Sequence, residues 1–179
     1  MILIKSNPEK EIGPLLAARG WRLAVAESCT GGLISHRITN VPGSSDYFLG
    51  GVISYANEGK QAWLEVREDT LQSAGAVSGE TVLEMSRGVR VSLRGFFPVP
   101  SILGLAVSGI AGPGGGSAEK PVGLVWIGLS AADGNWAWKF QFNGDRLDIK
   151  NRSADEALAI LLEYLKRGYP RPGWDLAAP

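Results

Sequence analysis

Short apolar runs alternate with amphipathic stretches along this chain, and turn residues separate them. Asp133-Gly134 between two apolar runs is typical of a β-hairpin. Alternation of strands and helices followed by a hairpin predicts a three-layer α/β/α sandwich with a mixed central sheet. The pattern predicts strands at 21–26, 47–55, 101–107, 123–131 and 135–143, and helices at 8–19, 31–39, 61–64, 68–73 and 145–166, with one more capped by Ser78 and ending near Leu93.

The length of 179 residues fits one domain, which we expect to occupy residues 1–167. Residues 168–179 contain three prolines and two glycines, and we expect them to form a loosely structured tail. The 18 basic and 18 acidic side chains cancel, which argues against nucleic acid as a partner.

The cysteine count and the apolar stretches of the sequence indicate the cellular compartment. A single cysteine leaves no intrachain disulfide and fits a reducing compartment. The sequence has no apolar stretch of membrane-spanning length, and its first residues lack the apolar region of a signal peptide. We therefore expect a cytoplasmic protein that does not contact a membrane.

Polar side chains gather at element ends between residues 22 and 60. The segment Glu27–Gly32 follows an apolar run and precedes an amphipathic one. Such a strand-to-helix turn is either a phosphate site at a helix N-terminus or a plain turn with Ser28 or Thr30 as N-cap, and the hexapeptide favours neither. A second glycine-rich loop, Ser108–Gly116, borders the same cleft if the sheet is open, or is a mobile surface loop.

The candidate nucleophiles lack a histidine partner. His36 is the only histidine and falls inside a predicted helix, where a solvated role is expected, so a Ser-His-Asp triad and a metal site are disfavoured. A serine nucleophile then requires another base, and Lys60 is the candidate, since a desolvated lysine is able to deprotonate a hydroxyl. The alternative is that Lys60 lies on a helix surface. Cys29 is a rival nucleophile, although a packing role is favoured for it.

A further pair of candidates, Asp145 and Arg146, opens the last predicted helix. Asp145 is expected to cap that helix, and Arg146 has the fork geometry that binds a phosphate or a carboxylate.

Seven ordered motifs resemble the CinA C-terminal domain family, which includes stand-alone nicotinamide-nucleotide amidohydrolases. The resemblance extends from about Val25 to the last helix. It implies an α/β/α fold and hydrolysis of nicotinamide mononucleotide to nicotinate mononucleotide and ammonia. The motifs are AESCTGG (26–32), VPGSS (41–45), GGVISYANEGK (50–60), GAVS (75–78), SGIAGPGGG (108–116), EKPVG (119–123) and NGDR (143–146).

The resemblance also implies roles for individual residues. Ser45 is the expected nucleophile and Lys60 the base that deprotonates it, assisted by Tyr55, with no metal and no cofactor. Ser28 is the reserve nucleophile, because the sequence alone places neither serine beside Lys60. Backbone N–H groups of the glycine loops are expected to hold an oxyanion or a phosphate. The substrate pocket is expected to contain Ser28, Thr30, Gly31, Gly32, Asn57, Ser108, Gly109, Gly112 and Arg146.

This chain departs from the family pattern beside Lys60. The family usually has Ser-Asn-Glu-Ala-Lys where this chain has Ala56-Asn-Glu-Gly59-Lys60. The change at Ala56 removes a possible hydrogen bond, and Gly59 loosens the segment that carries the lysine. Two alternatives to an active amidohydrolase therefore stay open: a catalytically inactive nucleotide-binding module, and a partner-binding domain associated with competence or DNA damage. The resemblance also suggests a homo-oligomer, a dimer or larger.

Overall fold

The computed structural model describes residues 7–171. Five strands form one mixed sheet in the order β2-β1-β3-β4-β5. Strand β1 pairs in parallel with β2 and β3, whereas β4 and β5 pair antiparallel. The strands are β1 (Arg22–Glu27), β2 (Phe48–Ile53), β3 (Ile102–Gly109), β4 (Leu124–Ser130) and β5 (Asn135–Gln141).

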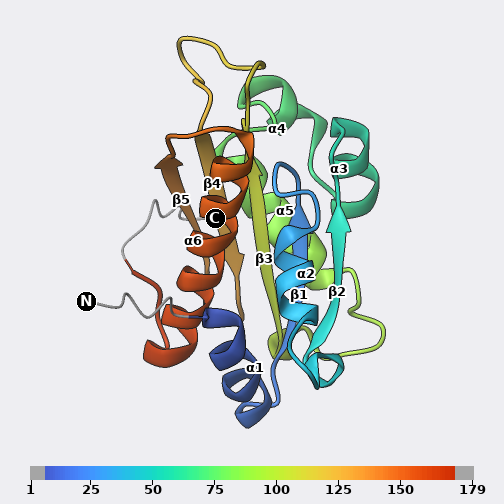
Figure 1. The fold of residues 1–179 in the computed structure, drawn as a ribbon. Helices are drawn as coiled ribbons and strands as arrows, with labels where there is room; N and C mark the ends of the chain where they lie inside the picture. Colours follow the sequence, from blue (N-terminus) through green and yellow to red (C-terminus); the bar gives the residue numbers. More distant parts are fainter. Residues whose placement is uncertain (1–6, 172–179) are drawn as a thin grey trace, which may run out of the picture.

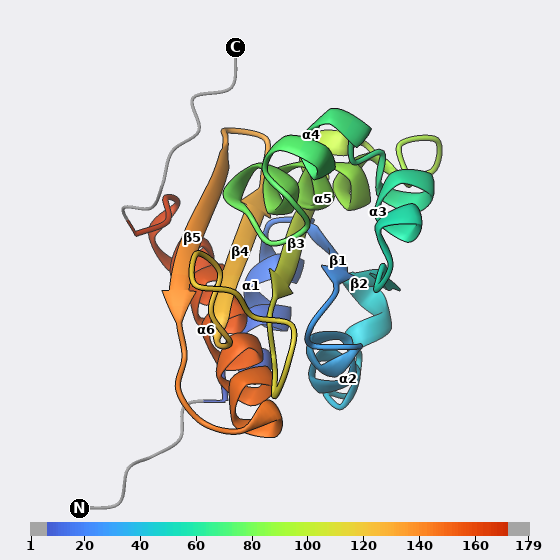
Figure 2. The ribbon, with the colours of Figure 1, turned by 90° about the horizontal axis from the view of Figure 1, so that it is seen from above.

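Helices cover both faces of this sheet, as Figures 1 and 2 show. One face carries α1 (Pro8–Ala18), α2 (Leu33–Thr39) and α6 (Arg146–Arg167). The other face carries α5 (Gly79–Val91), with α3 (Asn57–Leu64) and α4 (Glu68–Ser73) beside it. Two short 3₁₀ helices, η1 (Ser44–Asp46) and η2 (Val99–Ser101), precede β2 and β3. The expected three-layer α/β/α sandwich with a mixed sheet is confirmed.

Each face of the sheet buries its own hydrophobic core. Under α1, α2 and α6 the core includes Val25, Leu105 and Leu161, all fully buried. Under α5 the core includes Val82 and Met85. Burying a large apolar side chain contributes about 1.5–3 kcal/mol, so these two cores hold the three layers together.

Glycines allow α5 to approach the sheet closely. A Cβ at Gly104 on β3 would lie 2.0 Å from the Ser86 carbonyl oxygen, and one at Gly128 on β4 would lie 2.5 Å from that of Val82. Both separations are far below van der Waals contact. The α5 backbone therefore rests directly on β3 and β4, which fixes the loop that leads into α5 beside the end of β3.

An ion pair network joins the helices on the opposite face. The Arg37 guanidinium on α2 contacts Glu9 of α1 at 3.0 Å and Asp155 of α6 at 2.6 Å. Arg37 is largely buried, so solvent screens these contacts less than it would at the surface. The three helices on this face are thereby fixed relative to one another.

The start of the expected loose tail is held against α6. Gly168 forms the C-terminal cap of α6, and Arg171 contacts both Glu156 and Glu163 at 2.7 Å. These contacts hold residues 168–171 against α6, which differs from the expected loosely structured tail. Residues 172–179 lie outside the described part of the chain. Within residues 7–171, no helix is both long and apolar enough to cross a membrane.

Candidate functional site

Ser28 lies where the three parallel strands end together. It follows the last residue of β1, and its backbone N–H donates to the Val107 carbonyl of β3 at 3.0 Å. On the other side, the Ser54 N–H donates to the Glu27 carbonyl at 2.9 Å, so the chain leaving β2 runs beside Ser28. Carboxyl ends of parallel strands are where open α/β sheets place their sites.

Lys60 reaches Ser28 from α3. It is only 1% exposed, so the alternative interpretation of Lys60 as a helix-surface lysine is wrong. The Lys60 Nζ atom lies 3.2 Å from Ser28 Oγ, 2.8 Å from the Ser54 carbonyl oxygen and 3.3 Å from that of Tyr55. The structure thus brings together one serine and one lysine in a buried pair.

The surroundings of Lys60 suit a base. Burial lowers the pKa of the Lys60 amine, because desolvation disfavours the ammonium form. A neutral amine has two N–H donors and one lone pair. The Ser54 and Tyr55 carbonyls accept the two N–H groups, which leaves the lone pair directed at Ser28 Oγ. This is the geometry for accepting the serine proton.

The expected pairing of Ser45 with Lys60 is wrong. Ser45 is an exposed residue of η1, which precedes β2, whereas Lys60 lies in α3, which follows it. The six residues of β2 span roughly 20 Å at about 3.3 Å per residue. Figure 1 shows the turn between α2 and β2 at the opposite end of the sheet from α3. The reserve nucleophile, Ser28, takes the place expected for Ser45.

Tyr55 contacts Lys60 through its backbone carbonyl and not through its ring. Its side chain is 60% exposed, and its hydroxyl accepts a hydrogen bond from Arg146 Nη2 at 2.8 Å. Arg146 Nη1 also donates to the Gly112 carbonyl at 2.7 Å. Arg146 therefore joins the start of α6, the second glycine loop and the segment that holds Lys60.

The turn after Ser28 does not present a free helix N-terminus. The buried carboxylate of Glu27 accepts hydrogen bonds from the backbone N–H groups of Gly32, Ile34 and Ser35 and from the Ser35 hydroxyl, at 2.7–3.1 Å. The expected phosphate position at α2 is thus filled by a carboxylate of the chain itself. Gly32 is the N-cap, so the alternative interpretation of this turn, with Ser28 or Thr30 as N-cap, is also wrong.

The two glycines of this turn have a specific conformational role. Gly31 and Gly32 have φ values of 62° and 95°, in the region that side chains disfavour. Thr30 is fully buried, and its hydroxyl has no hydrogen-bond partner within the described residues. The backbone N–H groups of Cys29 and Thr30 donate to no other described residue, and that of Cys29 contacts its own thiol.

Cys29 is a packing residue. Its side chain is 5% exposed, and burial raises the pKa of its thiol to about 12, with a smaller contribution from the Glu27 carboxylate. The thiol is therefore protonated near neutral pH and is a poor nucleophile. His36 is exposed, and its ring Nε2 lies 3.1 Å from Asn40 Nδ2. Among residues 7–171, no group of three or more His, Cys, Asp or Glu side chains could hold a metal ion.

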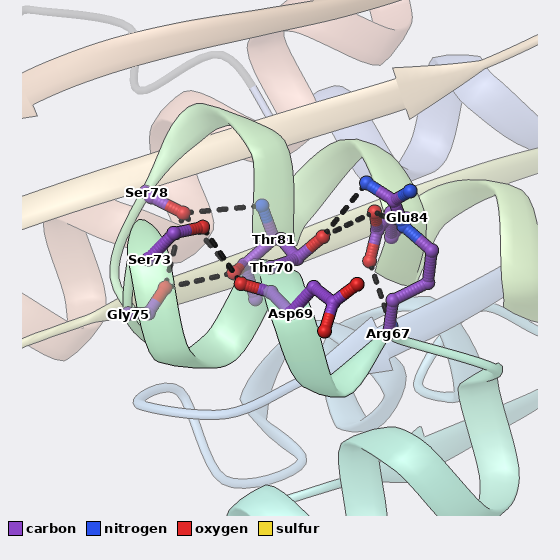
Figure 3. A network of polar contacts seen from close by, with 8 residues as sticks. All are labelled: Arg67, Asp69, Thr70, Ser73, Gly75, Ser78, Thr81 and Glu84. Carbon is purple, nitrogen blue, oxygen red and sulfur yellow. Dashed lines mark hydrogen bonds and ion pairs between the residues drawn. The ribbon is translucent and has the colours of Figure 1, made fainter.

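The loop before α5 forms a second wall, and side chains hold its carbonyls. Ser78 and Thr81 hydroxyls donate to the Gly75 carbonyl at 3.0 and 2.8 Å (Figure 3). The Ser108 hydroxyl donates to the Ala76 carbonyl at 2.7 Å, and Lys120 Nζ donates to that of Ala74. The Ser108 hydroxyl thus positions this loop rather than facing an open pocket.

The same network anchors α4 to α5. The Glu84 carboxylate accepts hydrogen bonds from the Arg67 backbone N–H, from Arg67 Nε and from the Thr70 hydroxyl, at 2.7–3.0 Å (Figure 3). A carboxylate satisfied by several donors fixes both segments that supply them. The loop between α4 and α5 is therefore held at both of its ends.

The remaining expected pocket residues are dispersed. Gly109 packs inward, since a Cβ there would lie 3.1 Å from Cys29 Sγ. Asn57 is an exposed residue that begins α3. Asp145 caps α6 as expected, accepting from the N–H groups of Leu147 and Asp148. A pocket of about 500 Å³ adjoins Arg146 but is not lined by Ser28 or Lys60. Its lining is Ala111, Pro113, Val122 and residues 144–147.

Sequence reasoning missed three contributors to the site. The backbone carbonyls of Ser54 and Tyr55 could not be predicted as partners of Lys60, because every residue has a backbone carbonyl. The role of Glu27 depends on the direction in which α2 leaves the strand. Lys150 had a signal: it follows Arg146 by four residues on a helix, which places both on one face.

These features define an α/β/α domain with a buried serine–lysine pair at the carboxyl edge of its sheet. The family model described as "CinA C-terminal domain" matches residues 5–165, and the chain belongs to this family.

Curated relatives and solved structures agree with this assignment. A CinA-like protein of Desulfotalea psychrophila is 49% identical over 154 residues, which cover 86% of this chain and 36% of that protein. The chain thus spans little more than a third of the curated relatives it matches. A CinA superfamily protein from Klebsiella pneumoniae has a TM-score of 0.81 at 33% identity, covering 89% of this chain and 96% of that one. The competence/damage inducible protein CihA from Agrobacterium tumefaciens has a TM-score of 0.79 at 35% identity, covering 93% and 100%.

Proposed function

We propose that this chain is an amidohydrolase that converts nicotinamide mononucleotide to nicotinate mononucleotide and ammonia. The observation that carries the proposal is the contact between Lys60 Nζ and Ser28 Oγ, with the amine held by two carbonyls in a buried position. The substrate comes from the family resemblance, because that family includes nicotinamide-nucleotide amidohydrolases.

The reaction begins at Ser28. Neutral Lys60 accepts the hydroxyl proton while Ser28 Oγ forms a bond to the carboxamide carbon. The backbone N–H groups of Cys29 and Thr30, which have no acceptor on another described residue, are candidate donors to the resulting oxyanion. The oxyanion then re-forms the carbonyl, the carbon–nitrogen bond breaks, and the leaving amide nitrogen takes the proton from the Lys60 ammonium and departs as ammonia.

Water completes the cycle. Lys60, neutral again, accepts a proton from a water molecule that attacks the serine ester. The ester bond breaks, Ser28 regains its proton from Lys60, and nicotinate mononucleotide leaves as the carboxylate after its acid proton has passed to solvent or to the released ammonia. No metal or redox partner is required for the atoms and electrons to balance.

The decisive experiment measures ammonia and nicotinate mononucleotide released by the purified chain. We expect Ser28→Ala and Lys60→Met each to lower kcat/KM by at least about 1000-fold, since nucleophile and base act as a unit. Ser45→Ala is the matched control and is expected to stay within about twofold of the wild type, because distant surface changes are nearly neutral.

Two results would overturn the proposal. A Ser28→Ala variant with more than a tenth of the wild-type rate would exclude Ser28 as the nucleophile. A wild-type chain that binds the nucleotide without releasing ammonia would instead be the nucleotide-binding module of the alternative interpretation.

A further inference from the structure

At this edge of the sheet, carboxylates of the chain itself already occupy the N-termini of α2 and α6. The Glu27 carboxylate caps α2, and Asp145 together with Asp148 forms a capping box at the start of α6. These carboxylates satisfy the backbone N–H groups that otherwise bind anions. A phosphate placed between α2 and α6 therefore needs cationic side chains rather than the backbone N–H groups of these two helices.

Three of the four cations at this edge are engaged with backbone carbonyls. Lys60 donates to Ser54 and Tyr55, Arg146 to Gly112, and Lys120 to Ala74. The fourth cation is on α6, one helical turn beyond Arg146.

That fourth cation, Lys150, has no hydrogen bond or ion pair among residues 7–171, and its side chain is only partly exposed. Its Nζ lies 3.5 Å from the position that a Cβ of Gly31 would occupy. Its charge also acts on the thiol of Cys29, the residue next to Ser28. The Lys150 amine, which has no partner among residues 7–171, thus lies over the turn that follows Ser28. It is close to Gly31, which has no side chain there.

We propose that Lys150 binds the phosphate of the substrate and thereby selects a nucleotide over the corresponding nucleoside; this rests on the proposed amidohydrolase function. The carboxamide and the phosphate are at opposite ends of the nucleotide, so an anchor for the phosphate orients the carboxamide toward Ser28. Lysine suits this role as a compact charge with three donors. Arg146 retains further N–H donors and faces the same side of α6.

The test compares nicotinamide mononucleotide with nicotinamide riboside, which lacks the phosphate. For Lys150→Met we expect KM for the nucleotide to rise roughly 10- to 100-fold, the loss typical of one charge-assisted hydrogen bond. The kcat value is expected to stay within about threefold, and turnover of the riboside is expected to be unchanged. Lys150→Arg is expected to recover part of the lost affinity. Equal losses on both compounds, or an unchanged preference, would overturn the inference.

A binding measurement separates this inference from the proposed function. Calorimetry with ribose 5-phosphate is expected to show binding to the wild-type chain and to Lys10→Met, a control on the exposed face of α1, but at least about tenfold weaker binding to Lys150→Met. If the wild type releases no ammonia yet shows this pattern, the anion site stands and the amidohydrolase fails. If ammonia is released but Lys150→Met binds ribose 5-phosphate normally, the anion site fails alone.

Discussion

In the proposed mechanism, the charge state of Lys60 controls whether Ser28 can lose its proton. In the ammonium form the third N–H points at Ser28 Oγ, so no lone pair is available to it. Burial lowers the pKa of Lys60 below the usual lysine value of about 10.4. The amine is therefore neutral over a range of pH in which a solvent-exposed lysine is still charged.

The pH dependence of turnover follows from this shift. We expect kcat/KM for nicotinamide mononucleotide to rise with pH and to level off above the lowered pKa of Lys60, at a pH below about 10.4. Lys60→Arg stays charged throughout, so its residual activity is expected to lack this rise. A wild-type profile that is flat from about pH 6 to 10 would show that deprotonation of Lys60 does not limit the reaction.

The choice between Ser28 and Ser45 illustrates what residue-level sequence reasoning cannot decide. Both serines stand in short motifs with glycine, and both precede Lys60. The two serines differ in their position in the fold. Ser28 follows the carboxyl end of β1, whereas α2 leads the chain back to the opposite end of the strands before Ser45 is reached. The motifs identify the chemistry, whereas the fold determines which serine meets the lysine.

Among the elements, α3 lacks a side chain that caps its first turn. Ala56 occupies the N-cap position with extended φ and ψ of −84° and 160°, and no side chain accepts a hydrogen bond there. This is the hydrogen bond that the departure from the family motif was expected to remove. Gly59, the other departure, lies in a formed helix and packs against Trp63, since a Cβ there would lie 3.1 Å from its ring.

Restoring the cap is expected to stabilise the protein. In Ala56→Ser the new hydroxyl would accept the Gly59 N–H, which raises the free energy of unfolding by about 1 kcal/mol. Urea denaturation measures the change. Ala17→Ser, at an exposed position in the last turn of α1, is the control and is expected to lower stability by up to about 0.5 kcal/mol through helix propensity alone. Equal effects at the two positions would mean that residue 56 is not a functioning N-cap.

The start of α2 depends on Glu27. Its carboxylate accepts four hydrogen bonds while fully buried, and a glutamine could not replace it because its NH₂ group would face backbone N–H groups. We expect Glu27→Gln to lower the free energy of unfolding by about 3 kcal/mol.

Urea denaturation measures the free energy of unfolding of Glu27→Gln and of a control variant. Glu119→Gln, at an exposed loop position, makes the same chemical change and is expected to shift stability by no more than about 0.5 kcal/mol. If Glu27→Gln matched that control, the carboxylate would not be what orders the turn after Ser28.

For the molecule as a whole, the periodicity of apolar and polar residues was sufficient to predict the layer architecture. Apolar runs of strand length and amphipathic runs of helix length specify the mixed sheet, and the Asp133-Gly134 turn joins β4 to β5. Periodicity could not place Lys60 inside a helix, because the start of α3 at Asn57 has no capping side chain to mark it. Nor could it assign the N–H groups of α2 to Glu27, since that pairing depends on three-dimensional proximity.

The hydrogen bonds of Arg146 to Tyr55 and Gly112 join two parts of the chain that are far apart in the sequence. Residues 27–60 supply the serine, the lysine and the carbonyls that hold it, whereas residues 108–150 supply the glycine loop and the cations of α6. If the two proposals hold, bond-breaking and ligand choice are encoded in different stretches of the gene. Diversifying the second stretch, in nature or in a mutant library, offers a route to new amide substrates that leaves the catalytic pair intact.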